Sequence, residues 1–139
     1  MKKIAIINGP NLNLVGKREA SIYGDVSLED YLTKLKENFS DVDLSFYQSN
    51  IEGEIVSLIQ TESIGADGII LNAGGYSHTS VAILDAIRAV NVPVIEVHIS
   101  NIYAREPYRR VSLLSEACVG VIAGLGLDVY RLALLAISR

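Results

Sequence analysis

Short apolar runs alternate along the chain with stretches in which apolar residues recur at helical spacing. The short runs predict five strands, at residues 3–7, 42–46, 68–71, 93–98 and 118–123. The helical spacing predicts helices over about 28–39, around 55–59, over 81–90 and over 128–137. An alternation of this kind is typical of βα units with a parallel sheet, and we interpret the chain as five such units.

Two local signals add to this interpretation. Ser27, with Asp30 three residues later, predicts the N-terminal cap of the first helix. In the second strand Val42, Leu44 and Phe46 alternate with other residues, as expected of a half-buried strand near an edge of the sheet. We therefore predict an α/β fold, a three-layer flavodoxin-like sandwich with a five-stranded parallel sheet of order 2-1-3-4-5 and right-handed crossovers.

Length and charge narrow the possible partners. The chain has 139 residues, which fits one domain spanning 1–139. Its formal net charge is −4, so we expect no nucleic-acid partner, because phosphate backbones bind basic faces. No apolar stretch approaches the roughly 20 residues of a membrane span, and the first residues read as a strand rather than a signal peptide. The lone cysteine, Cys118, suits a reducing compartment, and we expect a cytoplasmic protein without membrane contact.

Ligands of such sheets bind beyond the carboxyl ends of the strands, so the loops after the first, third and fourth strands are the candidate site. The first of these loops, residues 8–26, is long for a strand-to-helix connection. Arg18 lies five residues before Tyr23 within it. A guanidinium close to the phenol would lower the tyrosine pKa from about 10, so the pair could form a base when the loop closes. A surface tyrosine beside a solvated arginine is the alternative.

The loop after the third strand carries polar and glycine residues. Asn72 ends the strand and can both donate and accept hydrogen bonds, and Gly74 and Gly75 let the backbone approach a ligand closely. His78 is either a ligand contact or a capping, solvated residue. Asp85 follows seven residues later, and it would share the face of His78 if the helix extended that far.

The fourth strand places Glu96 and His98 on the same face, one step apart. A carboxylate in a buried strand is costly unless it is paired. Pairing with the imidazole would orient His98, raise its basicity and keep a proton available for donation. A purely structural ion pair is the alternative.

Positive charge gathers on loops of this otherwise acidic protein, at Lys17 and Arg18 and again at Arg105, Arg109 and Arg110. A local field of this kind suits a small anionic substrate. For Arg105 and Arg110, a surface or subunit contact is an equally open interpretation.

The chain lacks the sequence motifs of several other enzyme classes. The chain has no Gly-x-Ser-x-Gly elbow of a serine hydrolase and no Gly-x-Gly-x-x-Gly spacing in the first loop. Its two histidines and one cysteine lie in separate segments and make a poor zinc set. No lysine follows the third, fourth or fifth strand, where a Schiff-base lysine would be expected. The remaining set, a tyrosine base, a histidine acid, amides and arginines, fits proton abstraction beside a carbonyl followed by loss of a protonated hydroxyl.

Several short segments of the chain form a distinctive series. They are Asn8-Gly-Pro-Asn-Leu-Asn, Gly16-Lys-Arg-Glu with Tyr23-Gly24, Gln48-Ser-Asn with Glu52-Gly53, Leu71-Asn-Ala-Gly-Gly-Tyr-Ser-His-Thr-Ser, Glu96-Val-His-Ile-Ser-Asn, Arg105-Glu with Arg109-Arg110, and Gly120-Val-Ile-Ala-Gly-Leu-Gly. Each segment is short, and together and in this order they are highly specific. Through them the chain resembles, over essentially its whole length, the type II 3-dehydroquinate dehydratases.

The resemblance implies a reaction that turns 3-dehydroquinate into 3-dehydroshikimate and water, in the shikimate pathway or in quinate breakdown, without a metal or an organic cofactor. Tyr23 matches the base that takes the C2 proton, and Arg18 the residue that lowers its pKa. Asn11 matches the residue that holds a water against the enolate oxygen. His98 matches the acid that protonates the departing C1 hydroxyl, with Glu96 behind it.

The resemblance also implies substrate contacts and an assembly. Asn72 and the Ile99–Ser100 segment match the carboxylate site, while His78, Arg109 and the Asp85 of a neighbouring subunit match the contacts to the ring hydroxyls. The family forms dodecamers built from trimers, so a homo-oligomer is expected.

The chain departs from the family pattern at Ala20, where proline is frequent, and at Ser77, where threonine is common. One alternative of another class stays open, a flavodoxin-like binding module for a flavin or a nucleotide. That alternative explains the fold and the glycines, but it leaves Glu96, His98 and the Arg18–Tyr23 pair without a role.

Overall fold

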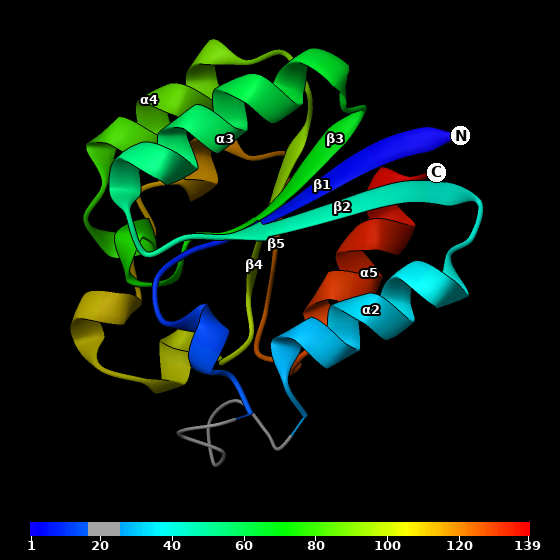
Figure 1. The fold of residues 1–139 in the computed structure, drawn as a ribbon. Helices are drawn as coiled ribbons and strands as arrows, with labels where there is room; N and C mark the ends of the chain where they lie inside the picture. Colours follow the sequence, from blue (N-terminus) through cyan, green and yellow to red (C-terminus); the bar gives the residue numbers. More distant parts are fainter. Residues whose placement is uncertain (17–25) are drawn as a thin grey trace.

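The computed structural model describes residues 1–16 and 26–139 (Figure 1). A five-stranded parallel sheet runs through its centre with the strand order β2-β1-β3-β4-β5. The predicted α/β fold and the predicted strand order are therefore confirmed. The strands are β1 (Lys2–Asn8), β2 (Val42–Gln48), β3 (Gly68–Asn72), β4 (Val94–His98) and β5 (Gly120–Ala123).

Helices cover both faces of the sheet. α2 (Leu28–Asn38) and α5 (Asp128–Ile137) lie on one face, and α3 (Glu52–Gly65) and α4 (Val81–Ala89) lie on the other (Figure 1). Successive side chains of a strand point to opposite faces, so β1 contributes to two separate apolar clusters. Its alternate isoleucines Ile4 and Ile6 pack on the side of α2 and α5, whereas Ile7 packs on the side of α3 and α4.

The starts of two helices follow from capping serines. The Ser27 Oγ accepts a hydrogen bond from the Asp30 N–H at 3.1 Å, which confirms the predicted cap of α2. The Ser80 Oγ accepts one from the Ile83 N–H at 3.0 Å and so begins α4. Each cap satisfies a backbone donor that the first helical turn leaves without a partner.

The connection between β4 and β5 corrects the prediction of five βα units. It consists of three short 3₁₀ helices, η3 (Ile102–Ala104), η4 (Pro107–Arg109) and η5 (Ser115–Ala117). Pro107 lacks a backbone N–H, and the charged residues around it show no helical apolar period, so an α-helix is not favoured here. β5 begins at Gly120 and not at residue 118, because η5 ends only at Ala117.

Three neighbouring strands end in polar residues at the same edge of the sheet. Asn8 ends β1, Asn72 ends β3 and His98 ends β4, and all three side chains are buried. Buried polar groups require hydrogen-bond partners, so this edge has to contain a polar network.

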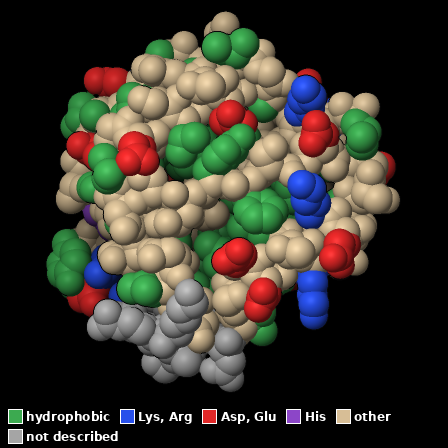
Figure 2. Space-filling view, viewed as in Figure 1, with side chains coloured by type: hydrophobic (Ala, Val, Ile, Leu, Met, Phe, Trp, Pro, Cys, Tyr) green, Lys and Arg blue, Asp and Glu red, His purple; other side chains and the backbone are tan. Residues whose placement is uncertain are grey.

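Charged side chains of both signs are interspersed on the face of the molecule that carries α2 (Figure 2). The described part of this face therefore shows no basic patch of the kind that phosphate backbones attract.

Candidate active site

A cavity of about 370 Å³ opens at the carboxyl ends of β1, β3 and β4. Its wall is formed by the loops after these three strands, as the sequence predicts for the ligand site. Seven of the predicted site residues lie in this wall. The lining residues are Pro10, Asn11, Leu12, Leu14, Asn72, Gly74, Gly75, His78, His98, Ile99, Ser100, Ile102, Arg105 and Arg109.

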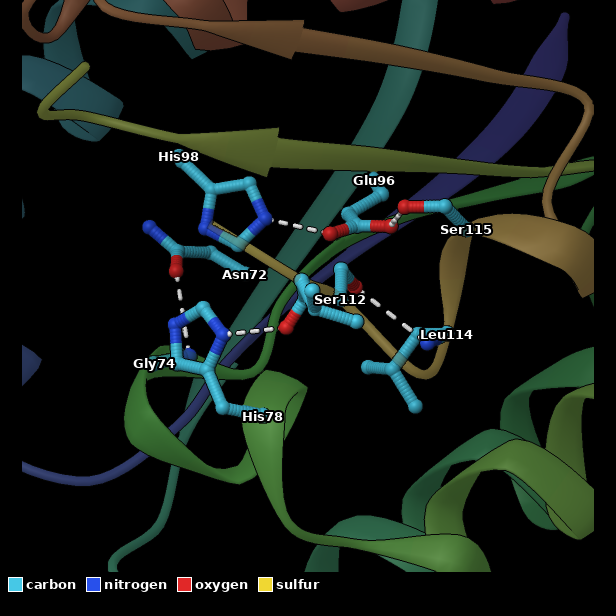
Figure 3. A network of polar contacts seen from close by, with 9 residues as sticks. Asn72, Gly74, His78, Glu96, His98, Ser112, Leu114 and Ser115 are labelled. Atoms are coloured by element: carbon cyan, nitrogen blue, oxygen red, sulfur yellow. Dashed lines mark hydrogen bonds and ion pairs between the residues drawn. The ribbon is translucent and has the colours of Figure 1, made fainter. Parts of the chain in front are cut away.

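Glu96 and His98 form the predicted pair on one face of β4. Glu96 Oε2 contacts His98 Nε2, and Glu96 Oε1 accepts a hydrogen bond from the Ser115 hydroxyl at 2.6 Å (Figure 3). Nδ1 of His98 points away from Glu96, on the side of Asn72 and His78 (Figure 3). Glu96 is therefore behind the cavity wall, and His98 forms part of the wall.

The pKa of Glu96 lies below its ordinary value although the side chain is completely buried. Burial raises its pKa, but hydrogen bonds from His98, Ser115 and Ser112, together with the charge of the imidazole, bring the pKa below its ordinary value. A carboxylate at Nε2 can only accept a hydrogen bond, so Nε2 of His98 carries the proton of this contact.

The His78 ring is oriented by a hydrogen bond to a backbone carbonyl, and the residue does not belong to an α-helix. It lies in η2 (Gly74–His78), before the start of α4, and its Nδ1 donates to the Val111 carbonyl oxygen at 2.8 Å. Because a carbonyl can only accept, Nδ1 carries a proton, so in the neutral ring Nε2 is the acceptor. The ring stacks on that of His98, with centroids 6.2 Å apart.

A buried network fixes the amide of Asn72. Its Nδ2 donates to the Tyr130 hydroxyl at 2.9 Å, and its Oδ1 accepts from the Gly74 N–H at 3.2 Å. The Tyr130 hydroxyl in turn donates to Asn8 Oδ1 at 2.5 Å. Burial raises the pKa of Tyr130 well above its ordinary value, so the hydroxyl keeps its proton as a donor. Tyr130 was not predicted as a site residue, and the only sequence signal for it is the excess of tyrosine over phenylalanine.

The loops after β1 and β3 pack backbone against backbone. A Cβ on Gly9 would lie 2.5 Å from the Ala73 carbonyl oxygen, and Gly74 has a φ of 59° beside the Pro10 carbonyl. Both Gly74 and Gly75 line the cavity, but only Gly74 is required by this packing, since Gly75 has open space around it. Asn11 also adopts a left-handed conformation, and its N–H donates to Asn50 Oδ1 at 3.0 Å.

The structure distinguishes the three arginines of the β4–β5 connection. Arg105 and Arg109 line the cavity, and Arg105 Nη1 donates to Ser100 Oγ at 3.3 Å. Arg109 also pairs with Glu106, three residues before it. Arg110 is exposed and lies outside the cavity wall. Two arginines thus line a cavity large enough for a small anion.

One predicted site residue, Asp85, lies away from the cavity, and two others are not described by the structure. Asp85 is exposed on α4 and is not part of the cavity wall, and because His78 precedes that helix, the argument that the two share a helix face is wrong. Arg18 and Tyr23 lie outside the described residues.

Among residues 1–16 and 26–139, no three His, Cys, Asp or Glu side chains form a group that could hold a metal ion. Within the same ranges, every helix is too short or too polar to cross a membrane.

Comparison with known proteins identifies the family. The family model described as "Dehydroquinase class II" matches residues 2–138. A 3-dehydroquinate dehydratase of Nitratiruptor sp. is 55% identical over 141 residues, covering 99% of this chain and 89% of that protein. The corresponding protein of Fusobacterium nucleatum is 56% identical over 136 residues, covering 94% and 92% of the two chains.

Solved structures agree with this match. The crystal structure of a type II dehydroquinase from Butyrivibrio crossotus is 40% identical and superposes with a TM-score of 0.94, covering 99% of this chain and 98% of the other. A 3-dehydroquinate dehydratase-like protein from Bifidobacterium longum is more distant, with 26% identity and a TM-score of 0.71 over 99% and 96% of the two chains. The match along nearly the whole length, together with the sheet order and the three-loop cavity, shows that this chain belongs to the class II dehydroquinase family.

Proposed function

We propose that this chain is a 3-dehydroquinate dehydratase, a hydro-lyase that converts 3-dehydroquinate into 3-dehydroshikimate and water within one catalytic domain spanning residues 1–139. Membership of the family supports the reaction. The observation that carries it is the buried Glu96–His98 pair, with His98 in the wall of a cavity that Arg105 and Arg109 also line. A histidine acid beside positive charge suits the dehydration of a small carboxylate substrate.

The proposed mechanism is an anti elimination through an enolate. Tyr23, with its pKa lowered by Arg18, takes the proton at C2, and a water held by Asn11 stabilises the enolate oxygen. His98 then gives a proton to the C1 hydroxyl, which leaves as water, and Glu96 keeps the imidazole charged and oriented until it does so. One turnover leaves a proton on Tyr23 and removes one from His98, so a proton passes from the tyrosine to the histidine, by way of solvent, before the next turnover.

The proposed substrate contacts form two groups, one for the carboxylate and one for the ring hydroxyls. Asn72 and the Ile99–Ser100 segment hold the substrate carboxylate, and His78 and Arg109 contact the ring hydroxyls. All of them line the cavity, which supports the assignment. The Asp85 of a neighbouring subunit completes the set, and its exposure on α4 is compatible with a contact to another chain.

We also propose that the protein forms a dodecamer of trimers in the cytoplasm. Exposed apolar side chains around the edge strand β5 support an assembly that covers them, because burying apolar surface between subunits is favourable. They are Val119 directly before this strand, Val121 within it and Leu125 after it. Light scattering of the purified protein tests this, since a monomer of 15.1 kDa would refute it.

The direct test of the proposed activity adds 3-dehydroquinate and follows the ultraviolet absorbance of the conjugated enone that the dehydration forms. We expect turnover without added metal or cofactor and with no loss in EDTA. Inactivation by EDTA that a divalent metal reverses would contradict the mechanism, and so would inactivation by borohydride in the presence of substrate, which reports an imine.

The base is tested by Tyr23→Phe, which removes only the phenol oxygen. We expect turnover to fall by about 10³-fold or more while the substrate still binds. The matched control is Tyr103→Phe, because Tyr103 is 61% exposed and lies outside the cavity wall. Full activity in Tyr23→Phe would refute the assignment.

The alternative of a flavin- or nucleotide-binding module finds no support in the family match. A purified protein with the visible absorbance of a flavin would reinstate it.

A further inference from the structure

We propose that Ser115 is a positioning residue for the acid of the proposed reaction, because its hydroxyl holds the Glu96 carboxylate in the orientation that serves His98. This inference rests on the proposed function for its catalytic consequence only. The contact itself is independent of it, since the Ser115 hydroxyl donates to Glu96 Oε1 at 2.6 Å while Oε2 contacts His98 (Figure 3).

The first step of the argument is the orientation of the carboxylate. The last torsion of a glutamate side chain has a broad energy profile, so one hydrogen bond leaves the carboxylate plane free to turn. A second donor, on the other oxygen, fixes the plane. Ser115 supplies this donor from η5, whereas Glu96 and His98 both come from β4. The position of the pair therefore depends on a segment that neither of its members belongs to.

The second step is that η5 is itself fixed. Leu114, directly before Ser115, is completely buried, and its N–H donates to Ser112 Oγ at 3.2 Å. The Leu114 carbonyl oxygen accepts from the Ala117 N–H at 3.0 Å. A hydroxyl on such a turn is held in place before the substrate binds, which a positioning residue requires.

The third step concerns charge. Glu96 is completely buried, and an ionised carboxylate there needs donors to replace water. Ser115 stabilises the ionised form, and this contributes to holding the pKa of Glu96 below its ordinary value against the opposing effect of burial. A protonated Glu96 would instead offer its own hydrogen to Nε2, and the ring would then be neutral and a poor acid.

Several other titratable or charged groups lie near the Glu96–His98 pair. His78 stacks on His98, and Arg105 and Arg109 line the same cavity but stay charged at all relevant pH values. Burial and the charge of Glu96 raise the pKa of Cys118 to about 12, so its thiol stays neutral. The titratable and charged groups near the pair are therefore His78, Cys118, Arg105 and Arg109.

The experiment compares Ser115→Ala with Ser138→Ala. Ser138 is a matched control, since its hydroxyl also makes a part-buried hydrogen bond of 2.6 Å, to the Leu134 carbonyl, at the end of α5. For Ser115→Ala we expect kcat for 3-dehydroquinate to fall roughly tenfold with little change in KM, because a hydrogen bond to a charged group is lost. The acid limb of the kcat profile should move to higher pH by on the order of one unit.

Ser115→Thr keeps the hydroxyl and should restore the profile. If Ser115→Ala does not fold, Ser115→Cys takes its place, since a thiol is similar in size but a weak donor, and the same shift is expected. The proposal would be overturned if the acid limb of the kcat profile stayed in place in the alanine or cysteine variant. It would also be overturned if the acid limb of the threonine variant shifted as far as that of the alanine variant.

A readout without substrate separates this proposal from the proposed function. In protein labelled with ¹³C at the glutamate carboxyl carbons, the resonance that disappears in Glu96→Gln reports the titration of Glu96. We expect its midpoint to rise in Ser115→Ala and to stay in place in Ser138→Ala. If the wild-type protein does not dehydrate 3-dehydroquinate, the proposed function fails while this titration still decides the role of Ser115.

Discussion

Tyr130→Phe is the most informative perturbation of the site, because it removes one atom from the centre of the buried network. The aromatic ring stays, so packing in the cluster of α2 and α5 is preserved. The hydroxyl oxygen that joins Asn8 to Asn72 is lost. The variant therefore tests whether a polar network, and not apolar packing, holds the ends of β1 and β3 together.

The expected magnitude follows from the two hydrogen bonds. Without the hydroxyl, Asn8 Oδ1 loses a donor at 2.5 Å and Asn72 Nδ2 loses an acceptor at 2.9 Å, and both side chains are buried. An unsatisfied buried polar group costs about 1–3 kcal/mol, so the free energy of unfolding should fall by about 2–4 kcal/mol. This is a large part of the 5–15 kcal/mol that is typical of a folded domain.

The assay is urea unfolding followed by far-ultraviolet circular dichroism, with all variants at the same protomer concentration because assembly contributes to stability. Activity is measured in parallel, and kcat/KM should fall by about tenfold, since Asn72 lines the cavity and loses one of its two fixed contacts. The control is Tyr103→Phe, which removes an exposed hydroxyl and should change neither quantity.

A loss of less than about 0.5 kcal/mol with unchanged kcat/KM would refute this reasoning, since effects of that size are ordinary for surface substitutions. A large loss of stability with normal kcat/KM would show that the network supports the fold without positioning Asn72.

Three further predictions concern stability and are measured by the same urea assay. Ser77→Ala should leave the free energy of unfolding unchanged or raise it by about 1 kcal/mol, because the Ser77 hydroxyl is completely buried and has no hydrogen-bond partner among the described residues; a clear loss would contradict this. Gly9→Ala should cost about 2 kcal/mol or more, because its Cβ would meet the Ala73 carbonyl oxygen at 2.5 Å; a neutral result would show that the two loops can separate. In the folded state the pKa of Glu96 lies below its ordinary value of 4.5. The stability that ionised Glu96 contributes is therefore complete above pH 4.5 and is lost as the pH falls through the folded-state pKa. Glu96→Gln should flatten this part of the pH–stability curve, and an unchanged slope would count against the reasoning.

Local patterns in the sequence predicted most of the fold. The strand runs, the Ser27 cap and the sheet order were confirmed, because they depend on neighbouring residues and on the short connections of a parallel sheet. The prediction of five βα units was wrong for the connection between β4 and β5, since the charged residues around Pro107 give no signal for the 3₁₀ turns that form there. The start of β5 was wrong for the same reason, because an apolar run does not show where the preceding turn ends.

Within the site, the sequence by itself determined which residues share a strand face or a loop, and Glu96 with His98 is the clearest case, because the two-residue period of a strand fixes their side. Only the tertiary structure decided which distant groups complete the network. Tyr130 reaches Asn8 across 122 positions of sequence, Ser115 reaches Glu96 from another element, and the Val111 carbonyl sets the proton of His78. Such contacts depend on where whole elements pack, and no spacing along the chain records that.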